Sequence, residues 1–278
     1  MLGRASGENF KVASRLLPSG ARRHLMAFYG YARLVDQIGD AYQGDRLAAL
    51  DWIEEETSRA LKDPESSGLV PLVARAAGSV TSLGLDPAPL YDLIAANRLD
   101  QTVASYETFE DLLGYCALSA NPVGRLVLGA FGVATADRIR FSDAICSGLQ
   151  LVEHWQDVAE DAAAGRLYVP AEDMRRFGVD RSELLSPPPA RAALRGLMIF
   201  ECARARKLLH DGGPLLSRLN GRCRWAVAGF WAGGLAALDG LAAQGFDPLR
   251  ATPRRPPARL ITGMLAGLSS SGASREAA

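Results

Sequence analysis

Two acidic segments contain the residues best suited to chemistry in this sequence. Each has two aspartates four residues apart, Asp36 and Asp40 in one and Asp157 and Asp161 in the other. Both segments have the apolar periodicity of a helix, where about 3.6 residues per turn place the two carboxylates on nearly the same face. Like charges at this spacing destabilise a helix slightly. A site that needs both carboxylates is one explanation for keeping them.

A divalent cation is the ligand that such carboxylates suit. Mg²⁺ prefers carboxylate oxygens, water and substrate phosphate as ligands. A charged side chain in a largely apolar helix also needs a compensating partner, because its burial is otherwise costly. The alternative interpretation is a pair of solvated helix faces, and helical spacing alone does not decide between the two.

Two arginines accompany the acidic pairs. Arg33 lies three residues before Asp36, and Arg166 follows Gly165 just past the second pair. A guanidinium beside a carboxylate-held metal can bind phosphate oxygens through two hydrogen bonds. The alternative for Arg33 is an ion pair with Asp36 or Asp40 on a surface. Since Gly165 suits a helix C-terminus, we expect Arg166 to reach back over the second acidic pair.

Two further side chains are candidates, and each has a structural alternative. Tyr115 lies in an apolar helical segment, where its phenol either faces a cavity or packs in the core with its hydroxyl hydrogen-bonded. His154 is one of three histidines and lies three residues before Asp157. It is either a general base or a structural histidine. The structural role is the default for both residues.

The elements that position these residues are predicted to be helices throughout. Alanine and leucine are abundant, β-branched runs are scarce, and nearly every segment has helical periodicity. Helices are predicted at about 21–41, 45–62, 69–83, 88–101, 108–118, 121–132, 141–163, 190–210 and 221–243. Proline- and glycine-rich breaks such as 186–189 and 212–214 separate them. We expect one all-α domain over residues 1–278, with a disordered tail at 269–278.

Composition narrows the class of protein further. The 278 residues are 48% hydrophobic, which is enough for a large core, and 31 basic residues balance 31 acidic ones. Without a basic excess, no nucleic-acid partner is expected. The cysteines lack metal-ligand spacing and are expected to be buried thiols in a reducing cytoplasm. The most apolar stretch, 225–238, is shorter than the roughly 20 residues of a membrane-spanning helix, so membrane contact would be peripheral.

The ordered motifs together resemble the squalene/phytoene synthase family. Residues 29–40 resemble the first aspartate-rich motif of that family, and residues 148–161 followed by 165–173 resemble the second. Tyr115-Cys116 with Val123-Gly124 resembles the segment between them, and residues 244–247 resemble the end of the last long helix. The resemblance covers roughly residues 8–262. It implies an isoprenoid (trans-prenyl) synthase fold, a helical bundle around a central cavity.

Within the family, three segments resemble hydroxysqualene synthases: residues 8–14, 119–125 and 154–157. The resemblance implies that presqualene diphosphate ionises with Mg²⁺ as cofactor and that water captures the rearranged cation, giving hydroxysqualene and diphosphate. It also implies a place in squalene and hopanoid biosynthesis and functional coupling to a presqualene diphosphate synthase. Because substrate and product carry long hydrocarbon chains, we expect a cytoplasmic protein with peripheral contact at the inner face of the membrane.

The resemblance also implies a role for each matching residue. Asp36, Asp40, Asp157 and Asp161 would bind Mg²⁺, together with Glu153, where the family usually has asparagine. Arg33 and Arg166 would bind the diphosphate, and Tyr115 would face the reacting carbons and stabilise a cation. The cavity would be lined by Phe10, Tyr29 and Gln150. Glu8 and His154 are the candidates for positioning the water.

Departures from the family pattern bear on the choice of reaction. Glu8 and Gln156 stand where many members that couple two substrates have basic residues, and fewer cations suit a single diphosphate. The alternatives are head-to-head condensation of two prenyl diphosphates, to presqualene diphosphate, squalene or phytoene, and a catalytically inactive helical scaffold. Retention of all four motif aspartates argues against the scaffold. Glu153 adds a charge and a methylene, so it either ligates the metal or alters its affinity.

Overall fold

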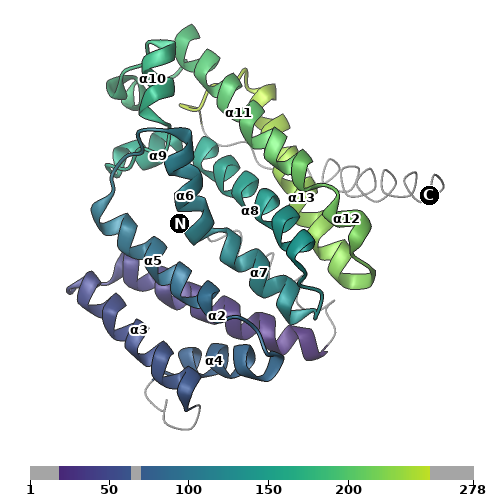
Figure 1. The fold of residues 1–278 in the computed structure, drawn as a ribbon. Helices are drawn as coiled ribbons and strands as arrows, with labels where there is room; N and C mark the ends of the chain where they lie inside the picture. Colours follow the sequence, from purple (N-terminus) through teal and green to yellow (C-terminus); the bar gives the residue numbers. More distant parts are fainter. Residues whose placement is uncertain (1–18, 64–69, 251–278) are drawn as a thin grey trace, which may run out of the picture. The chain divides into compact units, whose positions relative to one another are not determined.

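The computed structural model describes residues 19–63 and 70–250, and within them the chain is helical (Figure 1). This part of the chain contains no strand, and one isolated bridge pairs Ser105 with Leu167. The prediction of an all-α fold is confirmed. The candidates Glu8 and Phe10 and the tail at 269–278 lie outside the described residues.

The chain divides into two compact units. Unit 1 contains Met1–Thr102 and Ala117–Ile139, and unit 2 contains Val103–Cys116 and Arg140–Ala278. A single domain can contain two such units, so the expectation of one domain over the whole chain stays a prediction.

Unit 1 is a cluster of helices around a shared apolar core. Its helices are α2 (Ser19–Ala41), α3 (Arg46–Lys62), α4 (Pro71–Leu83), α5 (Ala88–Thr102) and α7 (Asn121–Ala130). Helix α2 contacts the other four. Tyr31 of α2 is fully buried among them, and its hydroxyl group lies 3.0 Å from Thr57 Oγ1 and donates to the Leu90 carbonyl oxygen at 3.2 Å. These two contacts tie α2 to α3 and α5.

The helix ends in unit 1 follow the local sequence. Asp45 is the N-cap of α3, and its carboxylate accepts a hydrogen bond from the Ala48 amide at 3.0 Å. Pro71 occupies the first turn of α4, where its missing N–H costs nothing. Gly84 ends α4 with φ +61°, a left-handed conformation that favours glycine. The predicted end of this helix at residue 83 is therefore confirmed.

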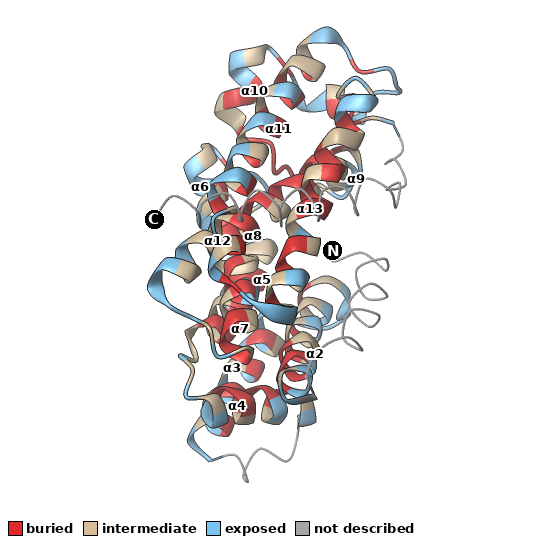
Figure 2. Cartoon of the chain, turned by 90° about the vertical axis from the view of Figure 1, so that its right-hand side faces the viewer, coloured by how far each residue is buried: buried red, intermediate tan, exposed pale blue. Residues whose placement is uncertain are grey.

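Unit 2 contains most of the remaining helices. They are α6 (Phe109–Ser119), α8 (Ala136–Gln156), α9 (Val158–Ala163), α10 (Ala171–Phe177), the 3₁₀ helix η1 (Arg181–Leu185), α11 (Ala192–Gly212), α12 (Leu215–Arg218) and α13 (Gly221–Ala243). The last residues of α6 and the first residues of α8 are assigned to unit 1. Helix α11 packs against α10 and α13, and α9 packs against η1. Buried and exposed residues alternate along each helix (Figure 2).

Small residues let helices of unit 2 approach closely. A Cβ atom added to Gly212 of α11 would lie 2.5 Å from Ile145 Cγ1 and 2.7 Å from the Phe141 carbonyl oxygen of α8. A Cβ atom added to Gly148 of α8 would lie 3.0 Å from the Leu209 side chain of α11. The α8–α11 contact therefore depends on glycine from both helices, and it fixes the helix that leads into the second acidic segment.

The structure differs from the predicted helices in three respects. The helix predicted to begin at residue 141 begins at Ala136. The helix predicted at 141–163 is divided at Asp157, whose φ of −107° and ψ of 12° lie outside the helical range. The break has no glycine or proline to predict it. The short helices α10, η1 and α12 were not predicted, because four to seven residues are too few to show a helical period.

Helix α13 is longer than the apolar stretch that the sequence suggested. It has 23 residues and is long and apolar enough to cross a membrane, although 56% of its most apolar window is buried inside the protein. Such burial is typical of a core helix. The four cysteines are free, and Cys116, Cys202 and Cys223 are buried while Cys146 is half-buried. Burial raises the pKa of Cys116 and Cys202 to about 12, so both stay protonated.

Candidate active site

The first acidic pair lies on α2 in unit 1. Asp36 and Asp40 are both half-buried, and Arg33, one turn before Asp36, is exposed. Burial raises the pKa of Asp36 above its usual range, while a hydrogen bond from Asn97 opposes the shift. The Asp36 carboxylate is thus held where protein groups only partly compensate its charge.

Two amides of α5 contact this segment of α2. Asn97 Nδ2 lies 3.4 Å from Asp36 Oδ1, and Gln101 Nε2 donates to the Gly39 carbonyl oxygen at 3.0 Å. Sequence reasoning missed both residues, because 61 positions separate Asn97 from Asp36. The one local signal was Gly39, a helix-weakening residue between the two aspartates.

The second acidic pair lies in unit 2, where α8 ends and α9 begins. Asp157 is the N-cap of α9, and Asp161 lies within it; both are half-buried. The backbone hydrogen bonds from Asp157 to Glu153 and from Asp161 to Asp157, at 3.0 and 2.8 Å, continue the helical pattern through the break. Burial raises the pKa of Asp157, and the charges of Asp161 and Glu160 raise it further.

Gly165 ends α9 as predicted and turns the chain back toward the acidic pair. Its φ is +86°, its amide donates to the Ala162 carbonyl oxygen at 3.1 Å, and the Arg166 amide donates to the Asp161 carbonyl oxygen at 2.8 Å. These two bonds form the Schellman motif of a helix C-terminus. Arg166 then lines the same recess as Asp161, in agreement with the prediction that it reaches back.

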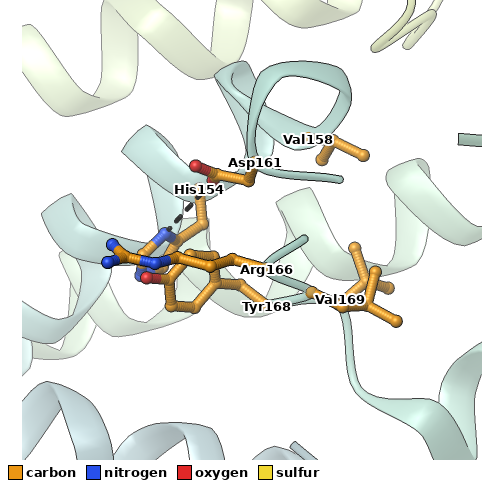
Figure 3. Close-up of a pocket in the computed structure, with 7 residues that line it drawn as sticks. His154, Val158, Asp161, Arg166, Tyr168 and Val169 are labelled. Atoms are coloured by element: carbon orange, nitrogen blue, oxygen red, sulfur yellow. Dashed lines mark ion pairs between the residues drawn. The ribbon is translucent and has the colours of Figure 1, made fainter. Parts of the chain in front are cut away.

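This recess gathers polar and aromatic side chains in unit 2 (Figure 3). Its lining residues are His154, Val158, Asp161, Arg166, Leu167, Tyr168 and Val169. Figure 3 shows Arg166, Tyr168 and His154 grouped on one side, with Val158 and Val169 on the other. The recess therefore combines a guanidinium, a carboxylate and an imidazole with an apolar wall.

His154 is held on two edges and one face. Its Nδ1 atom lies 3.9 Å from Asp161 Oδ2, and its Nε2 atom lies 3.2 Å from Gln150 Nε2. Its ring stacks on Tyr168 with 3.7 Å between centroids. Burial lowers the pKa of His154 more than Asp161 raises it, so the imidazole is neutral at physiological pH. With both nitrogens near protein partners, His154 is well placed to orient Asp161 and Gln150.

Tyr115 belongs to an aromatic cluster beside this histidine. The Tyr115 ring centroid lies 5.5 Å from that of Tyr106, 5.7 Å from Tyr168 and 6.1 Å from His154. A hydrogen bond from the Leu167 amide to the Ala104 carbonyl oxygen, 2.8 Å long, joins the two segments that supply Tyr106 and Tyr168. Aromatic faces attract cations. Sequence analysis identified Tyr115 alone, because the contact with the other two tyrosines is made only in the fold.

The donors available for a metal are carboxylates in pairs. No three or more His, Cys, Asp or Glu side chains among residues 19–63 and 70–250 lie close enough to one another to hold a metal ion. Mg²⁺ commonly uses one or two carboxylates and takes its other ligands from water and substrate phosphate. The raised pKa values of Asp36 and Asp157 also mean that a nearby divalent cation would stabilise their ionised forms. The residues present therefore fit Mg²⁺.

The other predicted residues are placed as follows. Tyr29 is half-buried on α2, and Glu153 is half-buried on α8, one turn before Asp157. Gln150 is engaged with His154. The structure thus groups Tyr115, Gln150, His154, Asp161 and Arg166 within unit 2, and Arg33, Asp36 and Asp40 within unit 1.

Comparison with known proteins gives a consistent result. A family model described as squalene/phytoene synthase matches residues 4–262. The hydroxysqualene synthase of Rhodopseudomonas palustris is 34% identical over 220 residues, which are 76% of this chain and 71% of that protein. The 15-cis-phytoene synthase of Synechocystis sp. is 31% identical over 79% of this chain and 68% of that protein. The crystal structure of squalene synthase HpnC from Alicyclobacillus acidocaldarius has 38% identity and a TM-score of 0.82, covering 89% of this chain and 92% of that one.

Proposed function

The chain belongs to the squalene/phytoene synthase family, and from that membership we propose that it is a hydroxysqualene synthase acting on presqualene diphosphate. The family uses prenyl diphosphates, so the chain is an enzyme of that kind. The observation that supports the specific proposal is the recess of unit 2. There the guanidinium of Arg166, which we propose binds the diphosphate, lies with Asp161 and His154, beside the tyrosine cluster.

In the proposed reaction the bond between carbon and the diphosphate oxygen breaks, and the diphosphate leaves with the electron pair. Arg33 and Arg166 bind the departing oxygens. Asp36, Asp40, Asp157 and Asp161, with Glu153, would hold Mg²⁺, which would supply further positive charge to stabilise the leaving group.

The carbocation that results is stabilised and then captured. The π faces of Tyr115 and its neighbouring tyrosines stabilise positive charge, and the apolar walls limit the access of water. The oxygen of one water molecule adds to the cation and loses a proton, giving the alcohol. His154 and Glu8 are the proposed positioning residues for this water, with Tyr29, Phe10 and Gln150 lining the cavity.

The second candidate function is head-to-head condensation of two prenyl diphosphates. The similarity to 15-cis-phytoene synthase over 79% of this chain favours it. Against it stands Gln156, a neutral residue one position before Asp157, where many members that couple two substrates have arginine. One diphosphate requires fewer cations than two.

Product analysis distinguishes these reactions. We would incubate the full chain with Mg²⁺ and either presqualene diphosphate or farnesyl diphosphate and identify the lipids by mass spectrometry. A C30 alcohol formed from presqualene diphosphate alone, and lost with EDTA or in Asp36→Ala, supports the proposal. The control is Asp211→Asn, which changes an exposed aspartate paired with Lys207 on α11. Presqualene diphosphate or squalene formed from farnesyl diphosphate, or phytoene formed from geranylgeranyl diphosphate in a parallel incubation, would refute it.

The proposal extends to location and partners. Because substrate and product carry long hydrocarbon chains, we propose a cytoplasmic enzyme with peripheral contact at the inner membrane face, functionally coupled to the synthase that supplies presqualene diphosphate. Co-sedimentation of the full chain with phospholipid vesicles tests the membrane contact, and protein that stays wholly in the supernatant would argue against it.

A further inference from the structure

We propose that Asn97 and Gln101 of α5 are positioning residues for the first acidic pair. We also propose that position 39 is a glycine because the Asn97 side chain occupies the space that a Cβ atom there would need. The inference rests on the proposed function in one respect, the role of Asp36 as a Mg²⁺ ligand. It adds Asn97 and Gln101, which lie outside both aspartate-rich motifs, to the residues of the site. It also gives a reason for the glycine at position 39, inside the first motif.

The two amides hold α2 at adjacent points. Asn97 and Gln101 are four residues apart, so both side chains project from the same face of α5. Asn97 is 7% exposed, and its Nδ2 atom lies 3.4 Å from Asp36 Oδ1 and 3.0 Å from the Leu93 carbonyl oxygen. Gln101 Nε2 lies 3.0 Å from both the Gly39 and the Asn97 carbonyl oxygens. One amide therefore contacts the carboxylate, and the other contacts the backbone three residues later.

The contact between Asn97 and Asp36 requires a glycine at position 39, because the Asn97 side chain lies where a Cβ atom would be. A Cβ atom on Gly39 would lie 2.1 Å from Asn97 Oδ1, 3.0 Å from its Cγ and 3.3 Å from its Cβ. Real Cβ atoms do not approach an oxygen that closely, so a larger residue would displace the Asn97 amide from Asp36. The close approach of α5 thus accounts for a glycine in the interior of α2, where it weakens the helix.

A neutral amide suits this task better than a charged group. An amide N–H can orient one carboxylate oxygen without adding a positive charge that would compete with a cation. Partners that orient a metal ligand in this way change metal affinity by roughly 10- to 100-fold when they are removed. A residue that served only packing would change stability and leave the metal affinity as it was.

The test is a double-mutant cycle on the full chain. The variants are Asn97→Ala, Gly39→Ala, the two combined, and Gln101→Ala, with Asp36→Asn as reference. Gly78→Ala is the matched control, because Gly78 is a helical glycine of unit 1 with nothing within 4 Å of an added Cβ atom. The affinity for Mg²⁺ is measured by calorimetry in the presence of inorganic diphosphate, and the unfolding temperature is measured without Mg²⁺.

We expect Asn97→Ala to weaken Mg²⁺ binding by roughly 10-fold or more, and Gln101→Ala to weaken it by less. Gly39→Ala should weaken binding at least as much as Asn97→Ala. Because the combined variant lacks the clashing amide, Gly39→Ala should add little in the Asn97→Ala background. Gly78→Ala should bind Mg²⁺ as the unaltered chain does. A Gly39→Ala chain that folds only when combined with Asn97→Ala would also support the inference.

Three results would overturn all or part of it. Unaltered Mg²⁺ affinity in Asn97→Ala, with a loss in Asp36→Asn, refutes the positioning role and leaves the proposed metal site intact. Unaltered affinity in both variants refutes the metal site as well. If Gly39→Ala lowers the Mg²⁺ affinity equally in the unaltered chain and in Asn97→Ala, the glycine is not there to make room for Asn97. That result overturns the part of the inference that concerns Gly39.

Discussion

The buried carboxyl of Glu201 on α11 gives the sharpest prediction about stability. Glu201 is 0% exposed, and among the described residues its Oε2 atom has no hydrogen-bond partner. Burial raises its pKa to about 8; Arg204, 3.5 Å away, opposes the shift, and the neighbouring Asp173 adds to it. Asp173 is itself bound to Arg204 at 2.5 Å. The arginine is thus shared between two buried acids.

The shift from 4.5 to about 8 sets the direction and size of the pH effect. Between those pH values the folded protein keeps a proton that the unfolded chain releases, so the free energy of unfolding falls as the pH rises through this window. Below it both states are protonated, and above it both are ionised. The full shift corresponds to at most about 5 kcal/mol, and relaxation around the partly exposed Arg204 reduces the expected fall to roughly 2 kcal/mol.

Glu201→Gln should remove this dependence, because glutamine has the same shape and stays neutral. Urea unfolding at pH 5, 7 and 8.5 would compare it with the unaltered chain and with Glu55→Gln, which changes an exposed glutamate. The variant should gain roughly 2 kcal/mol over the unaltered chain between pH 5 and 8.5. Equal pH dependence in both proteins would show that Glu201 is ionised in the fold at neutral pH, and the reasoning from burial would be wrong.

Three further substitutions test the packing. Tyr31→Phe removes a buried hydroxyl that contacts two polar groups and should lower the free energy of urea unfolding by about 1 kcal/mol; no change would mean those contacts add nothing. Gly212→Ala should lower the free energy of unfolding by about 1–3 kcal/mol, because its Cβ atom would lie 2.5 Å from Ile145. The control Gly114→Ala, whose Cβ atom would lie in open space, should be neutral or stabilising. Equal effects of the two substitutions would refute the close contact. Gly165→Ala places a side chain at φ +86° and should lower the free energy of unfolding by about 1–2 kcal/mol. It should also weaken diphosphate binding, because it shifts Arg166; undiminished binding would argue against a diphosphate-binding role for Arg166.

Sequence patterns predicted the long helices well because periodicity is a local property. Most predicted helix ends lie within two residues of those observed, and Gly84 and Gly165 end helices in the left-handed conformation that glycine favours. The break at Asp157 could not be predicted, since neither glycine nor proline occurs there.

The candidate site was predictable only where its residues are neighbours in sequence. Residue type and helical spacing identified the two aspartate pairs and the arginines, the resemblance supplied their roles, and the structure puts Asp161 and Arg166 in one recess. The contacts of Tyr106 with Tyr115, and of Asn97 with Asp36, join segments that no local pattern relates. Contacts of this kind arise from tertiary packing, so only coordinates show them.

Residues that violate local rules are still informative when their tertiary partners are known. The aspartate pair on α2 and the glycine between its members each weaken the helix. The contact with α5 accounts for the glycine, because the Asn97 amide beside Asp36 occupies the space that a Cβ atom at position 39 would need. Glu201 violates a local rule as strongly, but its partners are Arg204 and Asp173, outside the proposed site. A strained or charged buried residue therefore indicates function only when what it contacts has a part in the chemistry.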